Sequence, residues 1–147
     1  MKPIIDTITK EWVTENKPCV RALDWYKDYL GKSPIIILNR LIKAKKYGWA
    51  NWFIVRVMTY PDYVSYAVFA AEQVIDIYEK KYPDNKRPRE AIEAAKRCIK
   101  DPSDKNKRAA AVAAAWAATR AAAGAVAAAK IQLKILNYGT KLLKETK

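Results

Sequence analysis

Between Ala109 and Ala129 the chain is almost a run of one residue, since 15 of these 21 positions are alanine. Alanine has the highest helix propensity of the natural residues, so the tract is expected to be helical. Alanine also has no side chain beyond Cβ, which allows a neighbouring helix to approach more closely than the usual spacing of about 8–10 Å. The tract therefore predicts a helical protein in which alanine-rich helices pack closely.

One face of the expected helix is marked by five residues that follow each other at a spacing of three or four, namely Val112, Trp116, Thr119, Ala123 and Val126. The simplest interpretation is that this face packs inside the protein's own bundle, with Trp116 as its one bulky side chain. A homodimer or another partner packed on the alanine face is the alternative. Arg120 interrupts the apolar span, which is shorter than the about 20 residues that a bilayer requires, so no membrane contact is expected.

Proline, glycine and capping residues divide the rest of the chain into helices. The expected helices cover about 6–16, 18–31, 33–48, 49–60, 61–83 and 88–101, followed by helical sequence over 104–145. The last stretch is too long for one straight helix in a domain of 147 residues, so a bend or a break is expected between Gly124 and Lys130. We predict an all-α, single-domain bundle of seven or eight helices over 1–147, ending in a close-packed alanine-rich helix pair. Its aromatic and basic half is 1–60, and its alanine-rich half is 61–147.

The chain has no histidine, the side chain most often used for proton transfer near neutral pH. Its two cysteines, Cys19 and Cys98, lack the spacing of a zinc site and are expected to be buried free thiols of a cytoplasmic protein. We therefore expect no enzyme, no metal and no cofactor. Glu72, Asp76 and Glu79 share one helix face and could hold a metal ion, but pairing with nearby cations is the simpler interpretation.

The net charge of +13 is concentrated in two blocks: residues 29–61, with six bases and no acid, and residues 105–147, with nine bases and one acid. In the first block the cations alternate with aromatic residues such as Trp49 and Trp52, a combination typical of single-stranded nucleic-acid binding. The aromatic residues also have helical spacing, so a packed core with a basic outer face is the other interpretation. The candidate contacts for an acidic partner or nucleic acid are Arg40, Lys43, Lys45, Lys46, Arg56, Lys105, Lys107 and Arg108.

The remaining lysines of the second block lie towards the end of the chain and have no aromatic neighbour apart from Tyr138. They are expected to form a basic helix face whose role is solubility. This face includes Lys130, Lys134, Lys141 and Lys144.

Residues 66–97 contain a tyrosine, proline and arginine pattern between two expected helices, YEKKYPDNKRPREAIEAA. The stretch resembles bacterial immunity proteins of the Imm-5 type and related small phage proteins. The resemblance covers the second half of the chain and implies a non-catalytic protein that binds and blocks a bacterial protein or nucleoprotein in the host cytoplasm. It carries over no catalytic residue. The matching positions are Tyr78, Glu79, Tyr82, Pro83, Asp84, Arg87, Pro88, Arg89, Ala91, Ile92 and Glu93.

Arg87 and Arg89 lie near the expected start of a helix, where the helix dipole disfavours cations. They are expected to reach carboxylates such as Glu79 and so to form a structural clamp, with an exposed binding site as the alternative. The leading functional hypothesis is a protein-binding module of the immunity or counter-defence kind. Direct nucleic-acid binding through residues 40–56 is the alternative.

Overall fold

The computed structural model describes residues 5–101, 103 and 125–146 of the chain. Within these ranges it contains eight helices and no strand, so the prediction of an all-α bundle is confirmed. Residues 104–124, and with them the first helix of the predicted alanine-rich pair, lie outside the described ranges. The helices are α1 (Lys10–Asn16), α2 (Val20–Lys27), α3 (Pro34–Lys43), α4 (Tyr47–Val57), α5 (Tyr60–Glu72), α6 (Ile75–Lys81), α7 (Arg87–Lys100) and α9 (Ala125–Glu145).

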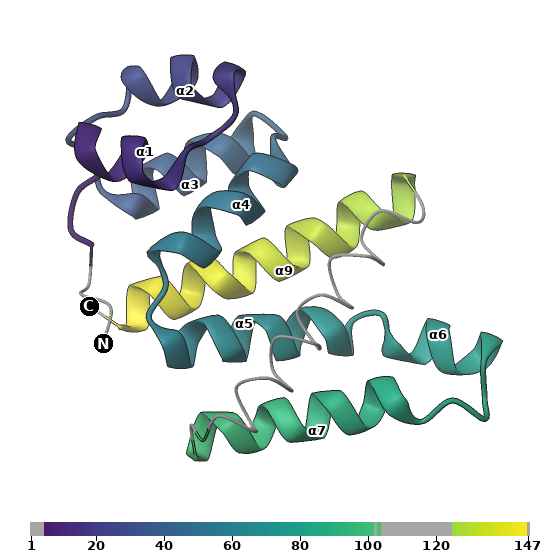
Figure 1. Cartoon of the computed structure of the whole chain (residues 1–147). Coiled ribbons are helices and arrows are strands. Elements are labelled where there is room, and N and C mark those ends of the chain that lie inside the picture. Colours follow the sequence, from purple (N-terminus) through teal and green to yellow (C-terminus); the bar gives the residue numbers. More distant parts are fainter. Residues whose placement is uncertain (1–4, 102, 104–124, 147) are drawn as a thin grey trace.

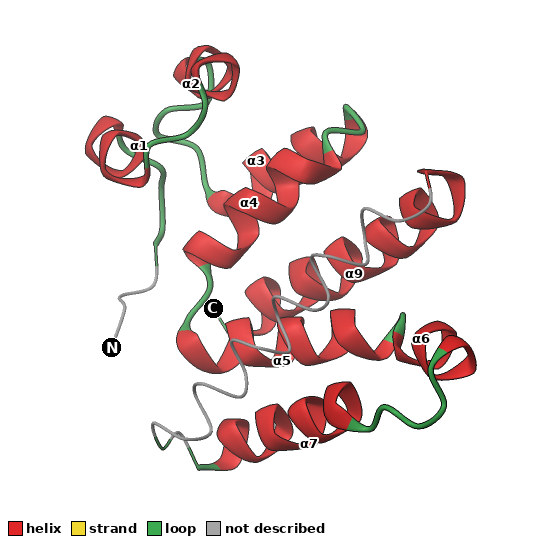
Figure 2. Ribbon diagram, turned by 45° about the vertical axis from the view of Figure 1, so that its right-hand side comes forward, coloured by secondary structure: helices red, strands yellow, loops and turns green. Residues whose placement is uncertain are grey.

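Helix α9 runs through the middle of the bundle (Figure 1). It packs against α3 and α4 on one side and against α5 on the other. Helix α7 packs on the far side of α5, and α6 continues from the end of α5. The short helices α1 and α2 lie beyond α3 and α4, at the opposite end of the bundle from α7, as the turned view also shows (Figure 2).

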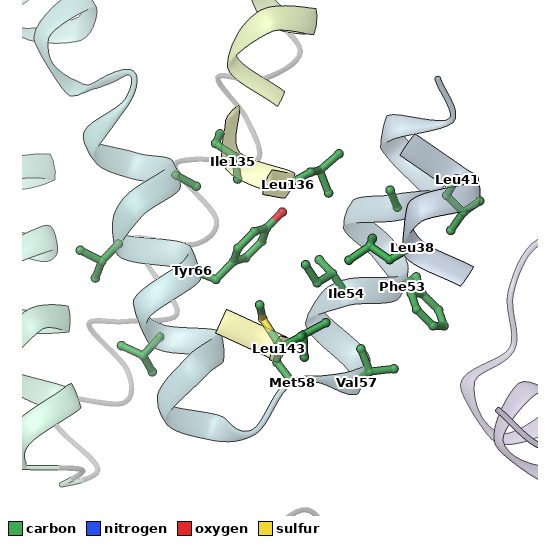
Figure 3. Close-up of a cluster of buried hydrophobic side chains, with 14 of the residues drawn as sticks. Leu38, Leu41, Phe53, Ile54, Val57, Met58, Tyr66, Ile135, Leu136 and Leu143 are labelled. Atoms are coloured by element: carbon green, nitrogen blue, oxygen red, sulfur yellow. The ribbon is translucent and has the colours of Figure 1, made fainter. Parts of the chain in front are cut away.

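The core lies where α3, α4, α5 and α9 meet (Figure 3). Gly139 of α9 lies at this junction, where an added Cβ would overlap Ile54 Cδ1 and lie 2.7 Å from Tyr66 Cε2. Glycine is therefore needed for α9 to approach α4 and α5 this closely. The other buried side chains of the junction include Leu38, Leu41, Phe53, Val57, Met58, Ile135, Leu136 and Leu143.

The start of α3 follows the sequence prediction, with Ser33 as N-cap and Pro34 as the first helical residue. The predicted end of this helix at Gly48 is wrong. Helix α3 ends at Lys43, the chain turns at Lys45 with a φ of 56°, and Gly48 lies in the first turn of α4. The turn uses a left-handed lysine instead of a glycine, which is why the glycine gave a misleading boundary.

The single long helix predicted over 61–83 is divided into α5 and α6. Neither proline nor glycine marks the break. Helix α5 ends where the backbone N–H of Val74 donates to the carbonyl oxygen of Ala71 at 3.2 Å, three residues back instead of four, and the φ of Val74 is −122°. The buried face is nevertheless the one predicted from helical spacing, since it includes Val64, Ala67, Val68, Ala71, Ile75 and Tyr78.

Helix α9 is continuous from Ala125, so no break occurs in the described part of the interval where a bend or break is predicted. Gly124 lies outside the described ranges. Helix α1 begins at Lys10, later than predicted, because the hydroxyl of Thr9 caps the helix by accepting from the backbone N–H of Trp12 at 3.1 Å.

Helix α2 begins at Val20, not at Pro18 as predicted. Its predicted inner face is only partly correct, because Tyr26 is buried whereas Leu23 is exposed. Cys19, which caps α2, is also exposed, so the prediction of a buried thiol is wrong for this residue and holds for Cys98.

Candidate functional site

The acid-free stretch places four cations at the junction of α3 and α4, which we call the cationic corner: Arg40, Lys43, Lys45 and Lys46. Arg40 and Lys43 belong to the last turn of α3, where they are neighbours on the helix surface. The backbone N–H groups of Lys45 and Lys46 donate to the carbonyls of Ile42 and Leu41, both at 2.9 Å. These two bonds close the helix end and fix the direction in which the corner leaves α3.

The corner is a concentration of positive charge that its own surroundings do not neutralise. Arg40, Lys43 and Lys45 are exposed, and Lys46 is half-buried. In the part of the chain that the structure describes, none of the four forms an ion pair with a carboxylate. The partial charges of the α3 carboxyl end account for some of the preference for cations here. Ammonium and guanidinium groups so placed can bind carboxylates or phosphates.

Arg56, predicted to act with these cations, lies at the other end of α4, about 15 Å from Lys46 along the helix. Its guanidinium carbon lies 4.1 Å from the centre of the Trp52 ring, and Nη1 donates to the Trp52 carbonyl at 2.8 Å. The structure therefore separates Arg56 from the corner and gives it a local packing role.

The aromatic residues of α4 connect this helix to α1 and α2. Trp12 of α1 meets the Phe53 ring edge-on at 5.6 Å between centroids, and Tyr26 of α2 stacks on the same ring at 5.8 Å. Trp49 makes an edge contact with Trp25 and carries the Lys46 ammonium 4.2 Å above its ring. These contacts favour the core interpretation of the aromatic residues over a platform for stacked bases.

Arg89 lies between α7 and α6, where it forms a two-pronged ion pair with Glu79. Nε and Nη2 donate to the two carboxylate oxygens at 2.9 and 2.7 Å, and Nη2 also lies 3.3 Å from Asp76 Oδ1. The hydrogen bonds from Arg89 hold the pKa of Glu79 below its usual value. Arg87 is exposed and forms no ion pair within the described ranges, and its backbone N–H donates to Asn85 Oδ1 at 3.2 Å. The two arginines therefore do not act as a pair.

A second cation of α7, Lys96, pairs with a carboxylate of α5. Lys96 Nζ lies 2.6 Å from Glu72 of α5 and 3.1 Å from Glu93, and these acids raise the pKa of the lysine. All three carboxylates considered as metal ligands are thus paired with cations of α7. Across the described ranges, no group of three or more histidine, cysteine or acidic residues is arranged to hold a metal ion.

One polar cluster was not predicted from the sequence. The carboxylate of Asp62, in the first turn of α5, accepts hydrogen bonds from the hydroxyls of Thr59 at 3.1 Å and Thr146 at 2.5 Å. A cavity of about 20 Å³ adjoins it, lined also by Val57 and Leu143. This volume suits a single water molecule and is too small for a substrate. No sequence pattern indicates this cluster, because Thr146 lies 84 residues from Asp62.

Three predicted contacts, Lys105, Lys107 and Arg108, lie outside the described residues, as does most of the alanine face considered for a homodimer. None of the helices in the described ranges is both long and apolar enough to cross a bilayer.

A family model described as a family of unknown function (DUF6931) matches residues 37–132, which include the cationic corner and the contact between α5 and α7. No curated protein and no solved structure matches the chain. The resemblance to immunity proteins therefore stays a prediction.

Proposed function

Since the chain belongs to the DUF6931 family of unknown function, we propose a function from its geometry: a non-catalytic module that binds a target protein through the cationic corner. The resemblance in residues 66–97 suggests the biological role of this module: immunity or counter-defence, in which it blocks a bacterial protein or nucleoprotein. The module would act by covering the target's surface.

The observation that carries the proposal is the contrast between two sets of cations. Arg89 and Lys96 are held in ion pairs that join helices of the same chain. Arg40, Lys43 and Lys45 are exposed and have no carboxylate partner within the described ranges. Cations without an internal carboxylate partner are available to pair with an acidic surface on another molecule.

A protein surface is favoured over single-stranded nucleic acid as the partner, because the tryptophan rings of α4 are not free to stack on a base. Trp49 and Trp52 pack against residues of α1 and α2, and each has a cation over its ring. If bases cannot stack on these rings, the cationic corner can bind a partner only through its positive charge.

The test is affinity capture from a nuclease-treated bacterial lysate, comparing the wild type with Arg40→Gln/Lys43→Gln/Lys45→Gln. We expect a defined protein to be retained by the wild type and lost from the triple variant. The matched control, Lys80→Gln/Lys81→Gln/Lys100→Gln, removes the same charge from exposed positions of α6 and α7 and should retain that protein. Equal capture by both variants, or recovery of nucleic acid alone, would contradict the proposal.

A further inference from the structure

Helix α9 carries a second cationic surface, which we call the lysine stripe: Lys130, Lys134, Lys141 and Lys144. At 100° per residue the four positions fall within an arc of about 80°, and they span about 21 Å along the helix axis. All four side chains are exposed, and exposed Asn137 lies in the same line. Three of the lysines lie beyond residue 132, so the stripe is largely a feature outside the family match.

The stripe faces away from the core. The buried residues of α9, among them Ile135, Leu136 and Leu143, occupy the opposite side of the helix and pack against α3, α4 and α5. Glu145 lies 3.8 Å from Lys141, but both side chains are more than half exposed, and such a pair contributes little. In the described ranges the other three lysines have no ion pair at all.

The residues around the lysine stripe argue against two kinds of partner, a membrane surface and the bases of a single strand. A membrane surface would require apolar side chains that can enter the lipid beside the lysines. The large exposed apolar residues of the described ranges lie on other elements, such as Val20, Ile77 and Ile99. Stacking on bases would require a free aromatic ring, but Tyr138 is stacked on Phe69 with centroids 4.0 Å apart. What the stripe offers is a straight row of ammonium groups and one amide.

A straight row of this length fits the backbone of double-stranded nucleic acid, which presents about 12 phosphates over 21 Å of its axis. We propose that the lysine stripe of α9 binds the phosphate backbone of a nucleic-acid duplex without reading its sequence. This surface is separate from the cationic corner and does not depend on the function proposed for that corner.

The experiment is a fluorescence-anisotropy titration of a short mixed-sequence DNA duplex at several salt concentrations. Four lysine–phosphate contacts predict that affinity falls by about 150-fold between about 50 and 200 mM salt. Lys134→Gln/Lys141→Gln removes two contacts, so the same salt change should then lower affinity by only about 12-fold. Both side chains are exposed, and circular dichroism would verify that the variant folds.

Two controls separate the stripe from the general effect of positive charge. Lys80→Gln/Lys100→Gln removes the same net charge from α6 and α7 and should keep the wild-type salt dependence. The triple variant of the cationic corner should also keep it, whether or not it loses a protein target. Absence of duplex binding at about 50 mM salt, or equal salt dependence in the stripe variant and the wild type, would overturn the proposal. Stronger binding of single strands or of polyglutamate would overturn it too.

Discussion

Replacing Gly139 with alanine is expected to destabilise the protein, although alanine is the better helix former. The new Cβ would overlap Ile54 Cδ1 and lie 2.7 and 2.8 Å from two ring carbons of Tyr66. Neither side chain can move away easily. Ile54 is fully buried, and Tyr66 is 3% exposed with its hydroxyl donating to Asn51 Oδ1 at 2.8 Å. Space for the methyl group therefore requires a shift of α9 or of the tyrosine ring.

The size of the effect follows from three contributions. Overpacking of a tight core costs about 1–3 kcal/mol. Displacing Tyr66 weakens a hydrogen bond worth about 1 kcal/mol, and alanine recovers about 1 kcal/mol through its helix propensity. The free energy of unfolding should therefore fall by about 1–3 kcal/mol, measured by urea denaturation with circular dichroism.

Gly48→Ala is the matched control, because a Cβ at Gly48 of α4 meets nothing within 4 Å. It should raise stability by up to about 1 kcal/mol. Ile54→Val removes the Cδ1 atom that the new methyl would strike, so it should cost about 1 kcal/mol alone and clearly less in the Gly139→Ala background. The close approach of α9 is refuted if Gly139→Ala stabilises the protein as Gly48→Ala does, or if the cost of Ile54→Val is the same in both backgrounds.

Three further outcomes are expected. Lys45→Gly should stabilise the protein by about 0.5 kcal/mol in chemical denaturation, since the φ of 56° at this position favours glycine, and a loss of stability would contradict the described turn. Because the pKa of Glu79 is lowered in the folded protein, its pair with Arg89 stabilises the fold above the ordinary glutamate pKa and ceases to do so as the pH falls through the lowered value. Glu79→Gln should therefore be less stable than the wild type near neutral pH, with the difference vanishing in acid; a difference that is independent of pH would argue against the pair. Of the two thiols, Cys19 should react rapidly with a thiol reagent in the native protein and Cys98 only after unfolding, so two fast-reacting thiols would contradict the burial of Cys98.

The helical class and several buried faces could be predicted because they depend on local pattern. Val64, Val68 and Ile75 recur at helical spacing and are buried. Ser33 followed by Pro34 predicts the start of α3 by the same kind of local argument. The break after Glu72 could not be predicted in this way, because neither proline nor glycine marks it and it rests on a change of backbone conformation at Val74.

The candidate site was harder to predict because its interpretation depends on contacts distant in sequence. Trp49 and Trp52 suit either a core or a stacking surface until Trp25 of α2 is placed beside Trp49, and Trp12 of α1 beside Trp52. Similarly, the acid-free stretch groups Arg56 with Lys43 in the sequence. In the structure Lys43 ends α3, the chain turns at Lys45, and Arg56 lies in the last turn of α4, far from that turn. The importance of Gly139 cannot be predicted from the sequence, because a glycine inside a helix is interpretable only when its neighbours across the interface are known.

The position of α9 has a practical consequence for truncation. The segment shared with the family stops at residue 132, yet α9 continues to Glu145 and supplies Ile135, Leu136 and Leu143 beyond that limit. A fragment trimmed to the shared segment would leave the inner surfaces of α4 and α5 facing water and should aggregate on expression. The segment that the family model matches is therefore shorter than the unit that packs around one core.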